Sequence, residues 1–487
     1  MTILNRRSFL SGMAAFAAAP AFGAVPKSGE VDVVIVGAGA AGIAAARRLT
    51  AEGRRVALLE ASGRIGGRCI TDTKTFGVPF DRGAHWIHIP ETNPVLRLGR
   101  EGFQIDQAAR GLRLRIGLRN AREGEVEDFL VAQVRSRRAI VEASRDADVS
   151  CAQALPTDLG TWRDTVEFVL GPYGCGKNLA DVSAKDFAKV DEREIDAICR
   201  QGYGALLAKL AGGLPIAQST AVKRIDWRRG IGVETEEGQL TARAVIVTAS
   251  TNVLASGAIE FDPELPRVQR DAFAKLSLGS RDHIALELPG NPLGLLRDEV
   301  VFEKATGTET AAVLANVSGT SLCLVEVGGS FGRDLASRGE DAMTAFAIDW
   351  LARLYGSDVK KAVKRKAATN WNREPYVLGA SSAAAVGGQP ARRLLMQPLG
   401  GRIWFAGEAV HETLWGTVGG AWESGDRAAA AVLKQLAAAD KPIREQPRSK
   451  RRRAPRTTVR QAPPPKRRQR PRTGRFGPNS VPYPTRN

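Results

Sequence analysis

The stretch that most constrains the fold lies near the N-terminus and reads VDVVIVGAGAAGIAAARRL, residues 31–49. It opens with a β-branched run, which is typical of a strand buried on both faces. Gly37, Gly39 and Gly42 follow with GxGxxG spacing, and helix-forming residues come directly after them. The first glycine permits a tight turn, the second lets a pyrophosphate approach the backbone, and the third packs helix against strand. The stretch therefore predicts a strand, a phosphate-binding turn and a helix.

A second strand and an acidic residue extend this prediction to a whole dinucleotide site. Residues 55–59 form another apolar run, and Glu60 follows it, 18 residues after Gly42. A carboxylate at this place accepts hydrogen bonds from the ribose hydroxyls of a bound nucleotide. Ala41, in the first turn of the expected helix, belongs to the same binding segment. We therefore predict an α/β domain of the Rossmann type.

The segment after Glu60 indicates which dinucleotide is bound. Residues 61–71 read ASGRIGGRCIT, a second glycine turn in which Gly67 stands between Arg64 and Arg68. The forked donors of these arginines can neutralise a pyrophosphate. The run from the first strand through the second turn resembles the FAD-binding start of the flavin amine oxidases, which include monoamine, polyamine and L-amino-acid oxidases. This resemblance implies FAD as the cofactor, since an NAD enzyme has no need of the second turn.

Two histidines in DRGAHWIH, residues 81–88, raise a choice between a metal site and a cofactor wall. The chain has four histidines, and the other two, His283 and His411, lie in distant segments. A metal site needs more ligands of suitable type and geometry, so we expect no metal. The stretch resembles the family segment that passes beside the flavin ring. Four residues are thereby implied to lie against the ring, the first two through close backbone approach: Gly83, Ala84, His85 and Trp86.

The resemblance continues along the rest of the folded chain. Residues 369–382, TNWNREPYVLGASS, are similar to the family's Trp-rich segment, and residues 402–433 resemble the segment that closes the cofactor site. The further cofactor contacts that it implies come from Val222, Trp371, Gly407, Glu408, Thr417, Val418 and Ala421. The helix expected after Gly416 would point its positive end at the flavin.

Two departures from the family pattern bear on the chemistry. Where the family usually has a lysine that holds a water near flavin N5, SRDHIALEL places His283. Gly379, Ala380 and Ser381 include no cysteine at the place of covalent attachment, so we expect non-covalent FAD. The residues implied to act in catalysis are His283, Trp371, Thr417 and His85.

The expected fold class is α/β, with a Rossmann-type FAD-binding domain built from discontinuous segments. These segments are residues 27–105, 203–276 and 398–440. The intervening residues 106–202 and 277–397 would form an inserted α+β substrate domain over the flavin face. We expect no internal repeat and no transmembrane helix.

The resemblance implies oxidation of a C–H bond beside an amine, with hydride transfer to flavin N5 and O2 as the acceptor that yields H2O2. The family's usual aromatic pair in front of the flavin is replaced by Ser381 and Thr417, which disfavours small arylalkylamines. We expect Trp86, Trp371 and Trp415 to supply partial walls of the cavity instead. One alternative is dehydrogenation of a carbon skeleton, as in phytoene desaturases and protoporphyrinogen oxidases. Another is a non-enzymatic, FAD-bearing envelope protein that acts through a basic tail.

The two ends of the chain read differently from its middle. Residues 1–24 contain Asn5-Arg6-Arg7-Ser8-Phe9-Leu10 and a short Ala-rich run, which resemble a twin-arginine export signal. We expect the export machinery to recognise it and the protein to be periplasmic or otherwise exported, the alternative being an uncleaved N-terminal arm. The five cysteines are scattered without a CxxC pair, so we expect neither a disulfide framework nor a zinc ribbon.

The C-terminal segment, residues 441–487, carries most of the basic character. Between Ile443 and Asn487 there are 15 Lys and Arg against one acid, so this part holds +14 of the net +18. Its Pro- and Arg-rich composition predicts a disordered tail. Because aromatic residues for base stacking are nearly missing, we expect it to meet anionic envelope surfaces rather than nucleic acid.

Overall fold

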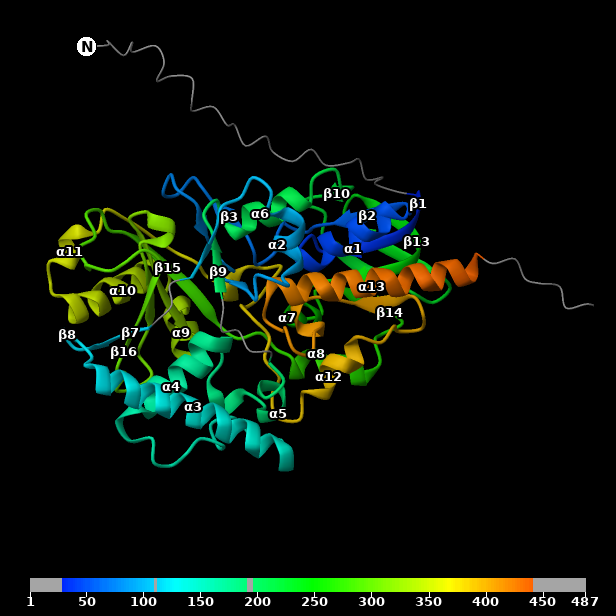
Figure 1. Cartoon of the computed structure of the whole chain (residues 1–487). Coiled ribbons are helices and arrows are strands. Elements are labelled where there is room, and N and C mark those ends of the chain that lie inside the picture. The colour runs from blue at the N-terminus through cyan, green and yellow to red at the C-terminus, as the bar shows by residue number, and fades with distance from the viewer. Residues whose placement is uncertain (1–28, 109–111, 191–195, 441–487) are drawn as a thin grey trace, which may run out of the picture. The chain divides into compact units, whose positions relative to one another are not determined.

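Two β-sheets organise the folded chain, and the first of them carries the glycine turn (Figure 1). The computed structural model describes residues 29–108, 112–190 and 196–440. The first sheet has the order β10-β2-β1-β13-β12-β11-β14, and β20 also pairs with β13. Its strands are β1 (Gly29–Val36), β2 (Val56–Leu59), β10 (Ile216–Ala217), β11 (Val222–Asp226), β12 (Ile231–Thr235), β13 (Gly238–Val247), β14 (Glu260–Asp262) and β20 (Ile403–Phe405). The strand, helix and strand expected over residues 31–59 are confirmed.

Helices cover both faces of this sheet, which explains the apolar character of β1. Val33 and Ile35 face one core, whereas Val34 and Val36 face the other. The first core is closed by α1 (Ala40–Ala51), α2 (Pro94–Gly99), α6 (Tyr203–Leu210) and α13 (Val418–Ala439). The second is closed by α7 (Thr251–Ala255), α8 (Arg267–Lys275) and α12 (Pro390–Leu395).

The first and last long helices of the described chain lie side by side in this layer (Figure 1). Their approach is very close at Gly425 of α13, where an added Cβ would stand 2.0 Å from the Ala41 carbonyl oxygen of α1. No side chain fits there, so the glycine lets two helices meet that are far apart in sequence.

The second sheet has the order β19-β15-β18-β17-β16-β7-β8. Its strands are β7 (Arg113–Ile116), β8 (Arg119–Asn120), β15 (Arg281–Glu287), β16 (Glu299–Glu303), β17 (Ala312–Ala315), β18 (Leu322–Gly328) and β19 (Arg365–Ala368). β15 and β18 are antiparallel, and their register sets His283 opposite Glu326. Because directly opposed residues point to the same face, these two side chains lie next to each other.

Helices and short strands complete the two-part fold. One face of the second sheet packs on α9 (Gly329–Ser337), α10 (Glu340–Tyr355) and α11 (Val359–Ala362). A separate core is built with α3 (Glu123–Asp146), α4 (Arg163–Phe168) and α5 (Ala184–Phe187). Small sheets pair β3 (Thr71–Asp72) with β4 (Phe80–Asp81), and β9 (Asp196–Cys199) with β5 (Ile87–His88) and β6 (Ile105–Gln107). The expected fold class, an α/β domain of discontinuous segments with an inserted second domain, is confirmed.

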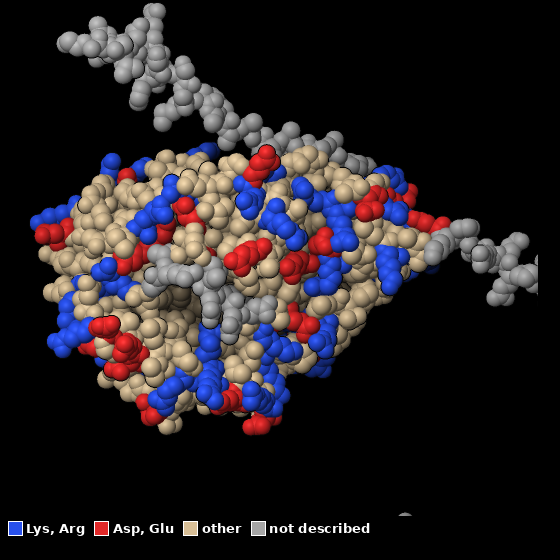
Figure 2. Space-filling model, in the orientation of Figure 1, with Lys and Arg blue, Asp and Glu red and all other residues tan. Residues whose placement is uncertain are grey.

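The surface of the folded part matches its nearly balanced charge. On the face shown in Figure 2, Lys and Arg are interspersed with Asp and Glu among the described residues. Among the helices described, none has the length and apolar run that crossing a bilayer requires. The proposed export signal and the basic tail both lie outside the described residues, so those interpretations stay predictions.

Candidate active site

The glycine turn between β1 and α1 has the geometry of a phosphate cradle. Gly37 has φ of +99°, a left-handed conformation that favours glycine. At Gly42 an added Cβ would lie 1.9 Å from the Gly37 carbonyl oxygen, so any side chain would force the helix away from the strand. Gly39 forms an isolated bridge with Gly66, which brings the second glycine turn beside the first. The N-terminal amides of α1 are therefore open to an anion.

Glu60 lies at the end of β2 and holds the two turns together. Its Oε2 accepts the Ala38 N–H at 2.7 Å, and its Oε1 accepts the N–H and the hydroxyl of Ser62 at 2.9 and 2.6 Å. The side chain is buried but borders the cavity. These bonds fix the carboxylate where a ribose would meet it.

Arg68 and Glu408 join the second glycine turn to the C-terminal segment. Arg68 donates to Glu408 at 2.8 Å and also to the Ala380 carbonyl. The Glu408 carboxylate accepts three more bonds, from the Ser382 N–H and hydroxyl and from the Gly416 N–H. Burial alone would raise the pKa of Glu408, but Arg68 and Ser382 lower it below its usual value. The carboxylate therefore stays anionic and clamps three separate segments.

The Trp-rich segment packs against the DRGAHWIH backbone. An added Cβ at Gly83 would stand 2.1 Å from the Arg68 carbonyl oxygen and 2.9 Å from the Trp371 ring. The indole N–H of Trp371 donates to the Arg82 carbonyl at 3.1 Å, and its backbone N–H donates to Asp282 at 2.9 Å. Trp371 is thus a fixed wall rather than a mobile side chain.

Thr417 caps α13 at the cavity. Its hydroxyl accepts the Gly420 N–H at 2.9 Å and donates to the Leu414 carbonyl at 2.7 Å. The hydroxyl is therefore engaged in the helix cap, and the N-terminus of a 22-residue helix faces the cavity.

These segments enclose one cavity of about 340 Å³. All the cofactor-contact residues expected from the sequence border it except Gly42, whose part is to pack α1 against β1. They are Gly37, Gly39, Ala41, Glu60, Arg64, Gly67, Arg68, Gly83, Ala84, His85, Trp86, Val222, Trp371, Gly407, Glu408, Thr417, Val418 and Ala421, and His283 joins them.

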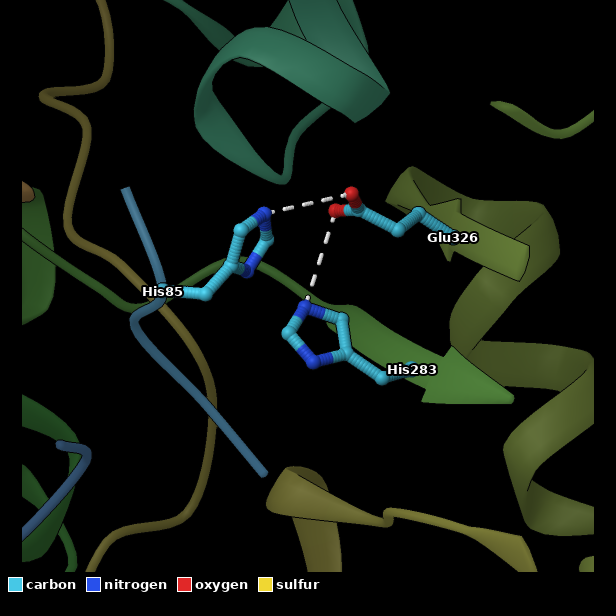
Figure 3. A group of neighbouring side chains, drawn as sticks. All are labelled: His85, His283 and Glu326. Atoms are coloured by element: carbon cyan, nitrogen blue, oxygen red, sulfur yellow. Dashed lines mark ion pairs between the residues drawn. The ribbon is translucent and has the colours of Figure 1, made fainter. Parts of the chain in front are cut away.

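His85, His283 and Glu326 lie together (Figure 3), and the two histidines border this cavity. The two imidazole rings have centroids 5.0 Å apart. The Nε2 atom of His85 lies 3.7 Å from Glu326 Oε1, and that of His283 lies 3.6 Å from Glu326 Oε2. On the other side of each ring, Nδ1 of His283 is 3.2 Å from the Asp81 carbonyl oxygen, and Nδ1 of His85 is 3.4 Å from that of Gly83.

Arg281 fixes the charge of this cluster. It donates through Nε and Nη2 to Glu326 Oε2 at 2.8 and 2.5 Å. Burial by itself would raise the pKa of Glu326, but Arg281 and the two imidazoles hold it well below its usual range. Burial lowers the pKa of His85 to about 3, so this ring is neutral at physiological pH. Within the described residues, His85 Nε2 and Glu326 Oε1 have no hydrogen-bond partner.

The cluster also has the donor atoms of a metal site, because one atom of each residue lies within 4.8 Å of the others. From the sequence we expected no metal because His283 is far from His85 along the chain, but the fold brings the two histidines together. Arg281 nevertheless opposes a metal, since its guanidinium already binds Glu326 Oε2 and would repel a second cation nearby. These three side chains are therefore better described as a group held by Arg281 than as the ligands of a metal centre.

Sequence reasoning missed two residues of this site and misplaced one. Arg281 and Glu326 carry no motif, and only the pairing of β15 with β18 brings Glu326 to His283. Trp415 was expected to form a partial cavity wall, but it is buried in a separate core, where Arg392 lies 4.8 Å over its ring. The sequence does not show whether an aromatic side chain beside a glycine turn faces the cavity or another core.

Comparison with known proteins decides the family. A model described as flavin-containing amine oxidoreductase matches residues 40–433. The chain belongs to this family. Polyamine oxidase 2 of Arabidopsis thaliana is 27% identical, over 83% of this chain and 88% of that protein. Lysine-specific histone demethylase 2 of Homo sapiens is also 27% identical, over 82% of this chain but only 53% of the demethylase.

Solved structures of two amine oxidases show the same fold. Putrescine oxidase bound to putrescine matches with a TM-score of 0.71 and 22% identity, over 84% of this chain and 100% of that one. Cyclohexylamine oxidase from Brevibacterium oxydans IH-35A matches with a TM-score of 0.71 and 20% identity, over 84% and 100%. Membership makes this protein an FAD-dependent oxidoreductase, which excludes the non-enzymatic alternative.

The residues present fit FAD. At Gly37, Gly42 and Gly83 an added Cβ would collide with neighbouring protein atoms, so these glycines permit the close packing that shapes the cavity. Glu60 is placed for a ribose, and the N-termini of α1 and α13 both face the cavity. Cys69 also borders it, but burial, with Asp81 adding to the effect, raises the pKa of its thiol well above the usual value. Such a thiol is a poor nucleophile for covalent attachment.

Proposed function

We propose that the protein oxidises the C–H bond beside the nitrogen of an amine. When bound, FAD would supply the oxidising chemistry, taking a hydride equivalent from the substrate carbon and passing its electrons to O2 to give H2O2. The imine product would then hydrolyse. The observation that carries this proposal is that the cofactor-contact residues, His283 and Trp371 all border the same cavity.

The chain contributes binding, orientation and exclusion of water. Glu60 would accept the ribose hydroxyls, and the amides at the start of α1 would meet the pyrophosphate. The N-terminus of α13 would stabilise negative charge on the flavin. Trp371 and the Gly83 backbone would fix the position of the ring. FAD would be held without a covalent bond.

The substrate end of the cavity argues against small aryl amines. Gly416 and Ser381 lie side by side, since an added Cβ on Gly416 would be 3.4 Å from the Ser381 Cβ. Neither Ser381 nor the neighbouring Thr417 offers an aromatic face for an amine. Walls that lack this aromatic pair leave room for a bulkier or more polar amine, such as a polyamine or an amino acid.

The test is to purify the protein, record its flavin spectrum, and add amines and amino acids without oxygen. Bleaching of the flavin near 450 nm by an amine, followed by H2O2 on admission of air, is expected. Reduction by a non-amine carbon skeleton and by no amine would instead establish the desaturase-like alternative.

We also propose that residues 1–24 direct export of the folded protein through the twin-arginine pathway, and that the basic tail contacts anionic envelope surfaces. Replacing Arg6 and Arg7 by lysine should keep the protein in the cytoplasm, as measured by cell fractionation. Unchanged fractionation would count against the export proposal. A chain ending at residue 440 should no longer bind anionic vesicles.

A further inference from the structure

The His85–Glu326–His283 cluster has a property that flavin binding does not explain. Glu326 does not border the cavity, whereas His85, His283 and Arg281 do. The carboxylate, only 2% exposed, lies outside the cavity lining, with its oxygens 3.7 Å from His85 Nε2 and 3.6 Å from His283 Nε2. A buried carboxylate in that position acts on the imidazoles rather than on a ligand directly.

Oxygen atoms and charged groups surround the His283 ring. Nδ1 faces the Asp81 carbonyl and Nε2 faces Glu326, so each ring nitrogen has an oxygen acceptor. The carboxyl groups of Asp81, Asp282 and Glu326 all interact electrostatically with it. Arg281 is the opposing cation, and the nearby His85 stays neutral. A neutral ring that donates from Nδ1 to the Asp81 carbonyl leaves Nε2 as the atom that can take up a proton, and the resulting N–H would point at Glu326 Oε2.

We propose that His283 accepts the proton that a substrate ammonium must lose before its C–H bond is oxidised, and that Glu326 is the positioning residue that stabilises the resulting imidazolium. The proposal rests on the proposed amine oxidation, because an ammonium has no free electron pair for that reaction. In this step an N–H bond of the ammonium breaks and its electron pair stays on nitrogen. The proton passes, through one water where the approach is not direct, to Nε2 of His283. Nothing is oxidised or reduced in the transfer.

Proton counting tests this step apart from turnover. A tert-alkylamine such as tert-butylamine has no hydrogen on the carbon beside its nitrogen, so it binds without being oxidised. Its binding to FAD-loaded enzyme at pH 8 is measured by calorimetry in two buffers of different ionisation enthalpy. Wild type should release close to zero protons to the buffer, because His283 keeps the proton. His283→Asn should release about one.

Kinetics supply the second readout. The rate of anaerobic flavin reduction at saturating amine is measured against pH. In Glu326→Gln the acid-side fall of this rate should move to lower pH by about 1–3 units, since the anion that favours the imidazolium is gone. The matched control is Glu287→Gln, which lies on β15, the strand of His283, but is paired with Arg365 at 2.6 Å and is outside the cavity lining. The control should keep the wild-type profile.

The outcomes separate this proposal from the proposed function. If no amine reduces the wild-type flavin, the proposed function fails. If wild type is reduced but His283→Asn releases the same number of protons and Glu326→Gln keeps the wild-type profile, only this inference is overturned. Stoichiometric zinc in purified wild type that disappears in His85→Ala would overturn it in favour of a metal site. Should Glu326→Gln fail to fold, the proton count of His283→Asn decides alone.

Discussion

Replacing Glu408 by glutamine should destabilise the protein strongly, although the two side chains have nearly the same shape. The carboxylate accepts bonds from Arg68 at 2.8 Å, from Ser382 at 3.1 and 2.7 Å and from Gly416 at 2.8 Å. Glutamine keeps one oxygen, and its NH2 group would face two of these donors. The change thus removes two hydrogen bonds and the charge that partners Arg68. Breaking a buried pair of this kind costs about 3–5 kcal/mol.

The assay is equilibrium unfolding in urea at equal, saturating FAD, so that cofactor binding contributes in the same way to each variant. Glu374→Gln is the control, because its ion pair with Arg64 is longer, at 3.5 Å, and about a third exposed on both sides. That variant should lose at most about 1 kcal/mol. A loss in Glu408→Gln no larger than in the control would refute the view that this carboxylate clamps the three segments.

Four further predictions follow from named contacts. Burial raises the pKa of Asp282 to about 6 from 3.8, so the folded state holds this proton more tightly than the unfolded chain and wild-type stability falls as pH rises through that window. Asp282→Asn should therefore be more stable than the wild type above pH 6, by up to about 3 kcal/mol, and should lose this advantage below the usual Asp pKa. Urea unfolding at pH 4 and pH 8 measures the difference. A variant less stable than the wild type at pH 8 would contradict the prediction. Gly83→Ala should fold poorly or lose FAD, because the new methyl group collides with the Arg68 carbonyl; normal flavin content would disprove the close approach. Glu60→Ala should raise the FAD dissociation constant at least tenfold in fluorescence titrations, since a charge-assisted bond is worth about 1.5–3 kcal/mol, and acid or heat should release the flavin intact. Benzylamine and phenethylamine should reduce the flavin more slowly than polyamines or amino acids, because the aromatic pair is missing. Faster reduction by the two aryl amines would contradict this prediction.

The sequence reveals motifs made of consecutive residues better than it reveals contacts between distant strands. The glycine turn and Glu60 could be predicted because a phosphate cradle, its flanking strands and its acid lie within about thirty consecutive residues. Glu326 could not, because its place beside His283 depends on the register of two strands whose facing residues are 43 positions apart. Alternating apolar residues show which face of a strand is buried, but not which partner lies opposite.

The direction of single side chains was also beyond sequence reasoning. Trp371 and Trp415 each lie near a glycine turn, yet the first borders the cavity and the second is buried elsewhere. Likewise, the histidines of DRGAHWIH could be assigned to the cavity through the resemblance. The position of His85 beside Glu326, however, depends on the second sheet.

The contact between α1 and α13 has a consequence for biosynthesis. The cofactor cradle begins at Gly37, but its last walls, Thr417, Val418 and Ala421, belong to a helix that leaves the ribosome only at the end of the folded part. Because Gly425 must pack against Ala41 before the cradle is closed, the nascent chain has no complete flavin site until α13 has been made. FAD capture is therefore a late event, and it reports that the chain has been synthesised through α13 and that α13 has packed on α1.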